Sequence, residues 1–161
     1  MAIKFESFSE RGGWWVVTQF ALFGLILLAM TRNQDAATVW QATVWQATGW
    51  LLAGAGALLT GAGLWVIRDT LTAMPAPLDK AVLRQHGPYT IVRHPIYSGL
   101  ILGFAGLAVK GGNLVAIGLA LGLIPFFYAK TSVEERLLVA RFPEYAEYRR
   151  TVRYRVLPWI L

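Results

Sequence analysis

Four apolar segments divide the sequence, and polar stretches separate them. The segments are residues 14–30, 45–67, 96–109 and 114–129, and none contains a charged residue. Runs of about 20 apolar residues are typical of membrane-spanning helices. The pattern predicts an all-α, polytopic membrane helical bundle with about four transmembrane helices. The third and fourth segments give roughly 21–24 Å of helix against a ~30 Å hydrocarbon core, so the sequence leaves open whether they cross completely.

The polar stretches predict turns and amphipathic helices. Three prolines interrupt residues 68–93, so this stretch does not form one helix, and a short amphipathic helix is predicted over 78–85. Pro95 suits the first turn of the third helix, with His94 near its cap position. Residues 110–113, KGGN, predict a tight turn.

After the fourth segment the chain becomes charged and amphipathic. The stretch SVEERLLVARF, residues 132–142, predicts one helix, and PEYAEYRRTVRYRV, residues 143–156, predicts another that begins at Pro143. We expect these amphipathic C-terminal helices to lie on the cytoplasmic surface of the membrane.

Small residues recur along the second and third segments. Ala53, Ala57 and Gly61 follow a four-residue spacing, and so do Gly99 and Gly103. Such stripes allow neighbouring helices to approach closely in a membrane. We interpret them as packing seams rather than as a groove for a cofactor.

Composition narrows the class of protein. Hydrophobic residues make up 56% of the 161 residues and charged residues 15%, so a single membrane-embedded domain over 1–161 is predicted, with the first two spans in 1–67 and a cofactor-binding half in 68–161. The absence of Cys excludes disulfides and thiolate ligands. The two His and the scattered carboxylates show no metal-ligand spacing, so no metal is predicted. The net charge of +6 is interpreted as membrane-flanking charge that contacts lipid, and nucleic-acid binding is not expected.

The basic residues also predict the orientation. Thirteen of the fifteen Lys and Arg residues lie before the first span, in residues 68–93 or after the fourth segment, whereas Arg32 and Lys110 lie on the other side. The positive-inside rule therefore places both termini and the polar clusters on the cytoplasmic face.

Two polar clusters carry the candidate chemistry. Residues 86–99 contain both histidines of the chain and lie directly before an apolar segment, and Glu134 and Glu135 follow the fourth segment. An Arg93 guanidinium can grip a carboxylate or phosphate, and a glutamate can accept two ribose hydroxyls or hold a cation. Taken singly, each of these residues has an ordinary explanation: a charged residue that flanks a membrane span, a helix cap, or a tyrosine at the membrane interface. Placed on one face of the membrane, the two clusters are predicted to meet and form one site.

The full set of motifs resembles the isoprenylcysteine carboxyl methyltransferase family and is similar to the phospholipid N-methyltransferases. The shared pattern is Gly87-Pro88-Tyr89, Val92-Arg93-His94-Pro95-x-Tyr97-x-Gly99, Glu134-Glu135-x-x-Leu138, and Phe142-x-x-Tyr145-x-x-Tyr148-x-x-x-Val152 with Pro158. The resemblance covers roughly residues 80–160 and implies a membrane enzyme that uses S-adenosyl-L-methionine. By position, the implied cofactor-binding residues are Tyr89, Val92, His94, Tyr97, Gly99, Glu134 and Glu135, to which we add His86. Arg93, which would orient the acceptor, and Glu135 are the catalytic candidates.

The predicted reaction is methyl transfer to a lipophilic or small carboxylate, amine or thiol acceptor that enters from the bilayer. Two alternatives remain open at this stage. Sterol and steroid reductases also combine an Arg-His pair, an acidic pair and a Tyr-x-x-Tyr tail, and they bind NADPH. A small non-enzymatic scaffold held together by its glycine seams is the third possibility. The sequence gives neither the acceptor nor the oligomeric state.

Overall fold

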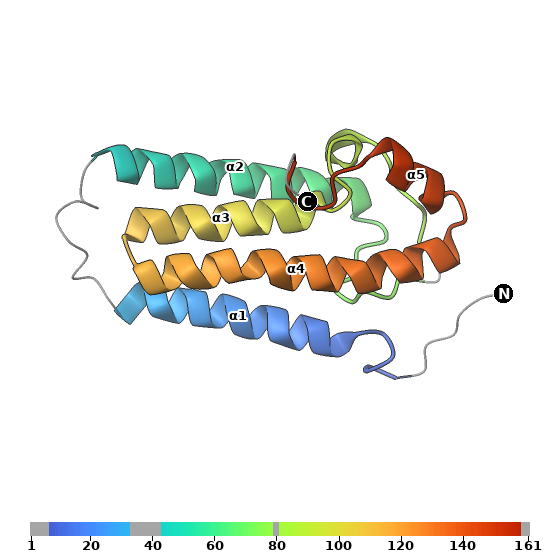
Figure 1. Ribbon diagram of the computed structural model, residues 1–161, viewed down its shortest axis with the longest axis horizontal. Helices are drawn as coiled ribbons and strands as arrows, with labels where there is room; N and C mark the ends of the chain where they lie inside the picture. The colour runs from blue at the N-terminus through green and yellow to red at the C-terminus, as the bar shows by residue number, and fades with distance from the viewer. Residues whose placement is uncertain (1–6, 33–42, 79–80, 159–161) are drawn as a thin grey trace.

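The computed structural model describes residues 7–32, 43–78 and 81–158, and in these ranges the chain is helical with no strand. Five α-helices follow one another, and a 3₁₀ turn at Gly87–Thr90 precedes the third (Figure 1). The helices are α1 Gly13–Arg32, α2 Thr43–Ile67, α3 Pro95–Gly111, α4 Leu114–Arg141 and α5 Tyr145–Thr151. The predicted all-α membrane bundle is confirmed.

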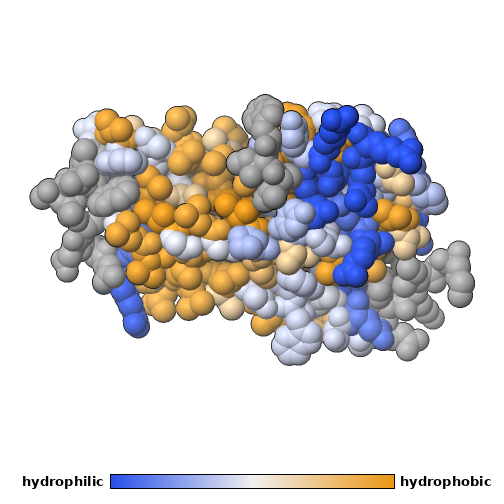
Figure 2. Space-filling model, viewed as in Figure 1, coloured by the Kyte–Doolittle hydropathy of each residue, from blue (hydrophilic) through white to orange (hydrophobic). Residues whose placement is uncertain are grey.

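Three of the described helices, α1, α2 and α4, are long and apolar enough to cross a membrane. The third predicted segment forms α3, which has 17 residues and is shorter. Figure 2 shows a hydrophobic surface over most of the bundle and a hydrophilic end around α5 and the loops. The α1 N-terminus, the C-terminal end of α2 and the α3 N-terminus all lie toward this polar end (Figure 1).

Helices α2 and α3 touch through glycine, but along a different stripe from the predicted one. The buried glycines of α2 are Gly49, Gly56 and Gly63, seven residues apart. A Cβ atom on Gly56 would collide with the backbone of Gly99 and Gly103 in α3. The predicted stripe of Ala53, Ala57 and Gly61 was wrong as a whole, because Ala57 and Gly61 are exposed, although Ala53 does pack against Gly106 of α3. The predicted stripe of Gly99 and Gly103 is confirmed as a contact with α2. A seven-residue repeat keeps one face of a helix against a partner in left-handed packing, whereas a four-residue repeat drifts away from it.

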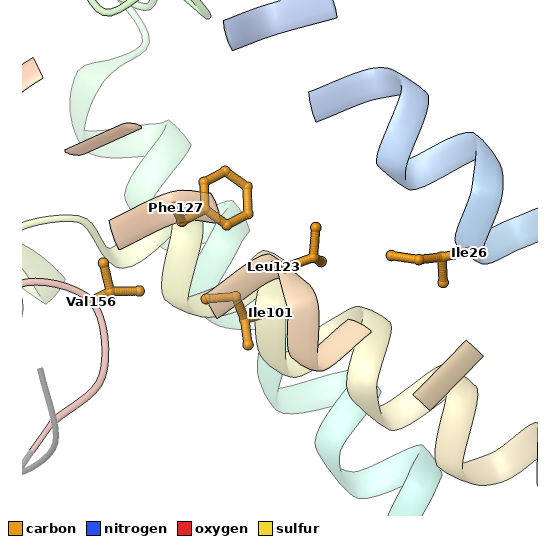
Figure 3. Close-up of a cluster of buried hydrophobic side chains, with 5 residues drawn as sticks. All are labelled: Ile26, Ile101, Leu123, Phe127 and Val156. Carbon is orange, nitrogen blue, oxygen red and sulfur yellow. The ribbon is translucent and has the colours of Figure 1, made fainter. Parts of the chain in front are cut away.

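The apolar core ties the remaining elements together. Ile26 of α1, Ile101 of α3 and Leu123 and Phe127 of α4 meet Val156 from the C-terminal segment (Figure 3). Each of the five is at most 5% exposed. The C-terminal segment is therefore part of the bundle core.

The turn between α3 and α4 has the predicted position. Gly112 adopts φ 62°, a left-handed conformation that glycine tolerates without strain. Asn113 caps α4, because its side chain accepts a hydrogen bond from the Ala116 N–H at 2.8 Å and its amide donates to the Ala29 carbonyl at 2.7 Å. This turn thereby fastens α1 to the hairpin at its far end.

Helix α4 differs from the prediction because it is continuous. A fourth apolar segment over 114–129 and a separate helix over 132–142 were predicted, but α4 runs without a break from Leu114 to Arg141, through Pro125. Proline is tolerated inside membrane helices, where neighbouring groups satisfy the freed carbonyl. As a result Glu134 and Glu135 stand on the same rigid helix as the core residues.

Two other predicted helices were wrong in the structure. Residues 78 and 81–85 form no regular helix, and residues 79–80 lie outside the described ranges. The predicted helix over 143–156 is limited to α5, Tyr145–Thr151, and residues 152–154 have no regular structure. The backbone after Thr151 is extended, and its carbonyls accept hydrogen bonds from Arg93 and His94.

Candidate functional site

The two predicted clusters meet in a buried ion pair. Arg93, just before α3, donates from Nε to Oε1 of Glu135 on α4 at 2.7 Å. The Arg93 and Glu135 side chains are 6% and 2% exposed. Arg155 and Arg149 approach the other carboxylate oxygen, each at 3.5 Å. The first cluster and the second are thus in direct contact through Glu135.

The same arginine also holds the C-terminal segment. Arg93 Nη1 donates to the carbonyls of Val152 and Arg153, both at 2.7 Å. The backbone N–H groups of Arg93 and His94 donate to the carbonyls of residues 154 and 155 at 3.0 and 2.9 Å. Ser98 of α3 donates its hydroxyl to the carbonyl of residue 156. Residues 152–156 therefore lie along the α3 N-terminus and satisfy its donors.

His94 occupies the predicted cap position of α3, but its ring has another role. The side chain makes no capping hydrogen bond, and Nε2 lies 3.3 Å from Glu135 Oε1. The ring stacks on Tyr97 with an interplanar angle of 13°, and Tyr97 in turn stacks on Phe127 at a centroid distance of 4.5 Å. This stack forms a rigid aromatic wall that runs from α3 to α4.

Glu134 faces a different environment from Glu135. Successive helical residues point about 100° apart, and Glu134 is half-buried while Glu135 is buried. Glu134 Oε2 accepts a hydrogen bond from the Tyr97 hydroxyl at 3.0 Å. Among the described residues Glu134 forms no ion pair, so its charge remains available to a ligand.

A cavity of about 510 Å³ lies beside this wall, at the polar end of the bundle. Its walls come from every helix and from the 70–84 loop. The size falls within the range of small-molecule sites, and the lining is mostly apolar with a few polar groups, as such sites usually are. Of the predicted site residues, the cavity is lined by Tyr89, Arg93, His94, Tyr97 and Glu134.

The other four predicted site residues lie outside the cavity lining. His86 is exposed at the start of the 3₁₀ turn, and Val92 is buried in the core at 2% exposure. Gly99 packs against Thr60 of α2, and a side chain there would strike the threonine. Glu135 is engaged by Arg93. Val92, Gly99 and Glu135 are therefore buried around the cavity rather than in its lining, whereas His86 lies at the surface.

Gln19, Lys130 and Tyr145 are among the cavity residues that the sequence analysis did not assign to the site. Lys130 was treated as the boundary of an apolar segment, although a charged residue one turn before Glu134 is itself a signal for a functional position. Tyr145 was recognised only as part of a motif. Gln19 gives no sequence signal beyond being a polar residue within a span.

The two motif tyrosines have different partners. The Tyr148 hydroxyl donates to the Tyr89 carbonyl at 2.7 Å and so holds the 3₁₀ turn. Tyr145 is 2% exposed, lines the cavity, and its hydroxyl has no hydrogen-bond partner among the described residues. Burial raises the pKa of Tyr89, Tyr145 and Tyr148. All three hydroxyls therefore remain protonated near neutral pH, and those of Tyr148 and Tyr89 already donate to carbonyls of the chain.

Comparison with known proteins places the site within a recognised sequence pattern. The profile described as phospholipid methyltransferase matches residues 44–145, more than half of the chain. The matched region includes Arg93, His94, Glu134 and Glu135. A cobalt-zinc-cadmium resistance protein, CzcN, of Cupriavidus metallidurans is 42% identical over 65 residues. Those residues make up 40% of this chain but only 30% of that protein, so the similarity covers less than a third of its length.

Proposed function

Since this chain belongs to the phospholipid methyltransferase family, we propose that it transfers a methyl group from S-adenosyl-L-methionine to a lipophilic or small acceptor reached from the bilayer. The observation that carries the proposal is the shared cavity of the two clusters. His94 and Tyr97 of the first cluster and Glu134 of the second line one hollow at the polar end of a membrane bundle.

The cavity suits the charge pattern of the methyl donor. Glu134 offers a carboxylate with no ion-pair partner among the described residues, which fits an ammonium, a sulfonium or a pair of ribose hydroxyls. The Tyr145 hydroxyl is buried without a partner in the described chain, and a buried polar group of this kind is normally satisfied. We propose that Glu134, Tyr145, His94, Tyr97 and Tyr89 hold the cofactor. When bound, the cofactor supplies an electrophilic methyl group on its sulfonium. A nucleophile of the acceptor, in line with the sulfur–methyl bond, takes up this methyl group.

Arg93 and Glu135 are better described as positioning residues than as groups that touch the acceptor. Arg93 donates three hydrogen bonds within the chain, to Glu135 and to two carbonyls of the C-terminal segment. These bonds fix the α3 N-terminus against α4, and they hold the His94 and Tyr97 rings in place. Alignment of reacting groups is the main contribution that such a transfer needs.

The apolar walls contribute by excluding water. Leu64 and Ile67 of α2 and Ile96 and Leu100 of α3 line the cavity beside the polar groups. Desolvation strengthens the electrostatic contacts of Glu134 and removes the hydration shell of the acceptor nucleophile. A carboxylate acceptor needs no base, whereas a protonated amine or a thiol has to lose its proton first. His94 Nε2 faces the Glu135 carboxylate, which can only accept, so it donates there and does not serve as that base.

We also propose that the polar end faces the cytoplasm. The N-terminus of α1, the C-terminal ends of α2 and α4, the N-terminus of α3, and α5 lie at this end (Figure 1). Among the described residues, most Lys and Arg lie in or beside these elements, and Arg32 and Lys110 lie at the opposite end. The positive-inside rule relates that distribution to the cytoplasmic side. The charged cofactor then enters from the cytosol, and the apolar acceptor enters from the membrane.

Ligand binding separates this proposal from the two alternatives. Purified protein in a neutral maltoside detergent is titrated with S-adenosylhomocysteine and, separately, with NADPH. Saturable binding of S-adenosylhomocysteine, and none of NADPH, supports the methyltransferase. Binding of NADPH alone supports a reductase, and binding of neither supports a scaffold; both results contradict the proposal.

A further inference from the structure

Arg84 lines the cavity, yet it uses almost none of its hydrogen-bonding capacity. Its Nε is buried without a partner, and the side chain forms no hydrogen bond with any described residue. Within the described chain it pairs with Asp69, at 3.8 Å between Nη2 and Oδ2, and the two side chains are 35% and 63% exposed. Such an exposed pair contributes little to stability. A guanidinium has five N–H donors, so the terminal nitrogens of Arg84 remain able to bind an anion.

The other Lys and Arg side chains in the described cavity lining already have partners. Arg93 donates to Glu135 and to two carbonyls of the C-terminal segment. Lys130 donates to a side chain of α1 and to a carbonyl of the 70–84 loop. Of the described cations that line the cavity, Arg84 is therefore the one that has no acceptor at hydrogen-bond distance.

The local fold places Arg84 at the polar end of the cavity. The preceding residue, Leu83, packs against the cluster that contains Tyr145 and Tyr148 of α5, and Asp69 follows the C-terminal end of α2. Both of these elements lie at the polar end of the bundle (Figure 1). A side chain that lines the cavity and is also 35% exposed stands where the cavity meets the aqueous side.

The proposed methyl donor has one group that the contacts described above leave unmatched. Its amino-acid end carries a carboxylate beside an ammonium, and Glu134 suits the ammonium, the sulfonium or the ribose but repels a second carboxylate. Arginine binds a carboxylate through two parallel, charge-assisted hydrogen bonds. The amino-acid end is also the most hydrophilic part of the donor, so it fits the exposed end of the cavity.

We propose that Arg84 binds the amino-acid carboxylate of the methyl donor and exchanges its weak contact with Asp69 for this carboxylate. The inference rests on the proposed function, because it adds a binding residue for the same cofactor. It makes Arg84 a specificity-determining residue that favours adenosine thioethers with an intact amino acid over those that lack the carboxylate.

The test compares two ligands that differ only in this carboxylate. Purified wild-type protein in a neutral maltoside detergent is titrated calorimetrically with S-adenosylhomocysteine and with decarboxylated S-adenosylhomocysteine, which keeps the ammonium. A charge-assisted hydrogen bond is among the strong ones in proteins, so S-adenosylhomocysteine should bind about tenfold or more tightly than its decarboxylated form. Equal binding, or tighter binding of the decarboxylated compound, overturns the proposal.

Arg84→Gln connects the preference to this residue. The variant should bind S-adenosylhomocysteine about tenfold or more weakly than wild type, and it should bind the decarboxylated compound as wild type does, so the preference disappears. Arg84 forms no hydrogen bond within the described chain, so Tm should remain close to that of wild type. A preference that persists in Arg84→Gln, or an equal loss of affinity for both compounds, contradicts the carboxylate contact.

Two control variants separate ligand binding from a structural role of the ion pair. Arg68 approaches the same Asp69 at 3.9 Å but lies outside the cavity lining, so Arg68→Gln should keep the full preference. Asp69→Asn removes the present partner of Arg84 and should bind S-adenosylhomocysteine at least as tightly as wild type. If Asp69→Asn loses as much affinity as Arg84→Gln, the pair itself supports the cavity and the proposal is wrong.

The same titrations distinguish failure of this inference from failure of the proposed function. Wild-type protein that binds both compounds equally is still a protein with a site for the methyl donor, and only the role of Arg84 is then refuted. Wild-type protein that binds neither compound contradicts the proposed function, and the role of Arg84 is refuted with it.

Discussion

Arg93 and Glu135 are 42 positions apart in the sequence, yet Nε and Oε1 are 2.7 Å apart and both side chains are buried. The pair joins the N-terminus of α3 to the C-terminal part of α4, and Nη1 of Arg93 holds the C-terminal segment. The candidate cavity depends on this junction, because His94, Tyr97 and Glu134 are direct neighbours of the two residues.

The Arg93–Glu135 ion pair should make a large contribution to the free energy of unfolding. Glu135→Gln leaves the buried Arg93 guanidinium without its counter-charge, and removing one partner of a buried pair costs about 3–5 kcal/mol. Thermal unfolding in detergent should show a large decrease in Tm. Arg149→Gln is the matched control, since the Arg149 side chain is 45% exposed and lies 3.5 Å from the same carboxylate. An exposed pair contributes about 0–1 kcal/mol, so equal Tm decreases in the two variants would refute the central role of Arg93.

Glu134 should affect binding rather than folding. Glu134→Gln keeps an acceptor for the Tyr97 hydroxyl but removes the charge that faces the cavity. A hydrogen bond to a charged group contributes about 1.5–3 kcal/mol, so the affinity for S-adenosylhomocysteine should fall about tenfold to a hundredfold with little change in Tm. Glu147→Gln, on the outer surface of α5 and paired with Arg150, serves as the control. Wild-type affinity in Glu134→Gln would remove this residue from the site.

The two tyrosines of α5 should respond in opposite ways to loss of the hydroxyl. Tyr145→Phe removes a buried hydroxyl without a partner among the described residues, so Tm should hold or rise. The variant should bind S-adenosylhomocysteine more weakly, with a loss of about 0.5–1.5 kcal/mol in binding free energy, the net contribution of one hydrogen bond. Tyr148→Phe removes the 2.7 Å bond to the Tyr89 carbonyl and should lower Tm. If Tyr145→Phe binds as wild type while Tm is unchanged, the hydroxyl does not contact the cofactor.

The glycines of α2 should differ in tolerance according to the face they occupy. Gly56→Ala places a methyl group against the backbone of Gly99 and Gly103 and should separate α2 from α3, which lowers Tm and ligand affinity together. Gly61→Ala meets no atom within 4 Å and should be neutral or stabilising by about 0.5–1 kcal/mol, since alanine favours the helix. Equal effects of the two substitutions would mean that the seam is not the contact that positions α3.

The sequence was sufficient to predict that the two clusters meet, because apolar segment counting and the basic residues place Arg93 and Glu135 at the same end of the bundle. It did not predict that these two residues bind each other, since an arginine that faces a ligand and one that faces a glutamate have the same local pattern. The extended segment after Thr151 was missed for a related reason. Its backbone carbonyls are the acceptors for Arg93 and His94, and backbone acceptors leave no trace in side-chain periodicity.

The small-residue stripe on α2 and the position of Lys130 show a second limit of prediction from sequence, since both depend on how the helices pack. A four-residue template selected Ala57 and Gly61, whereas the contact follows the seven-residue repeat of Gly49, Gly56 and Gly63. Both repeats are present in the sequence, and which of them forms the contact depends on where α3 packs against α2. Lys130 was assigned to a segment boundary because it is the first charged residue after the apolar run 114–129, and the continuity of α4 places it inside the bundle.

Methyl transfer is the most direct test of the central claim. Purified protein is incubated with S-adenosyl-L-methionine labelled in its methyl group and with total membrane lipid, and the extracted products are analysed by mass. The account predicts label in a lipophilic or small product, formed by wild type and strongly reduced in Glu134→Gln. A folded wild-type protein that transfers no label to any lipid or small acceptor, and that fails to bind S-adenosylhomocysteine, would contradict it.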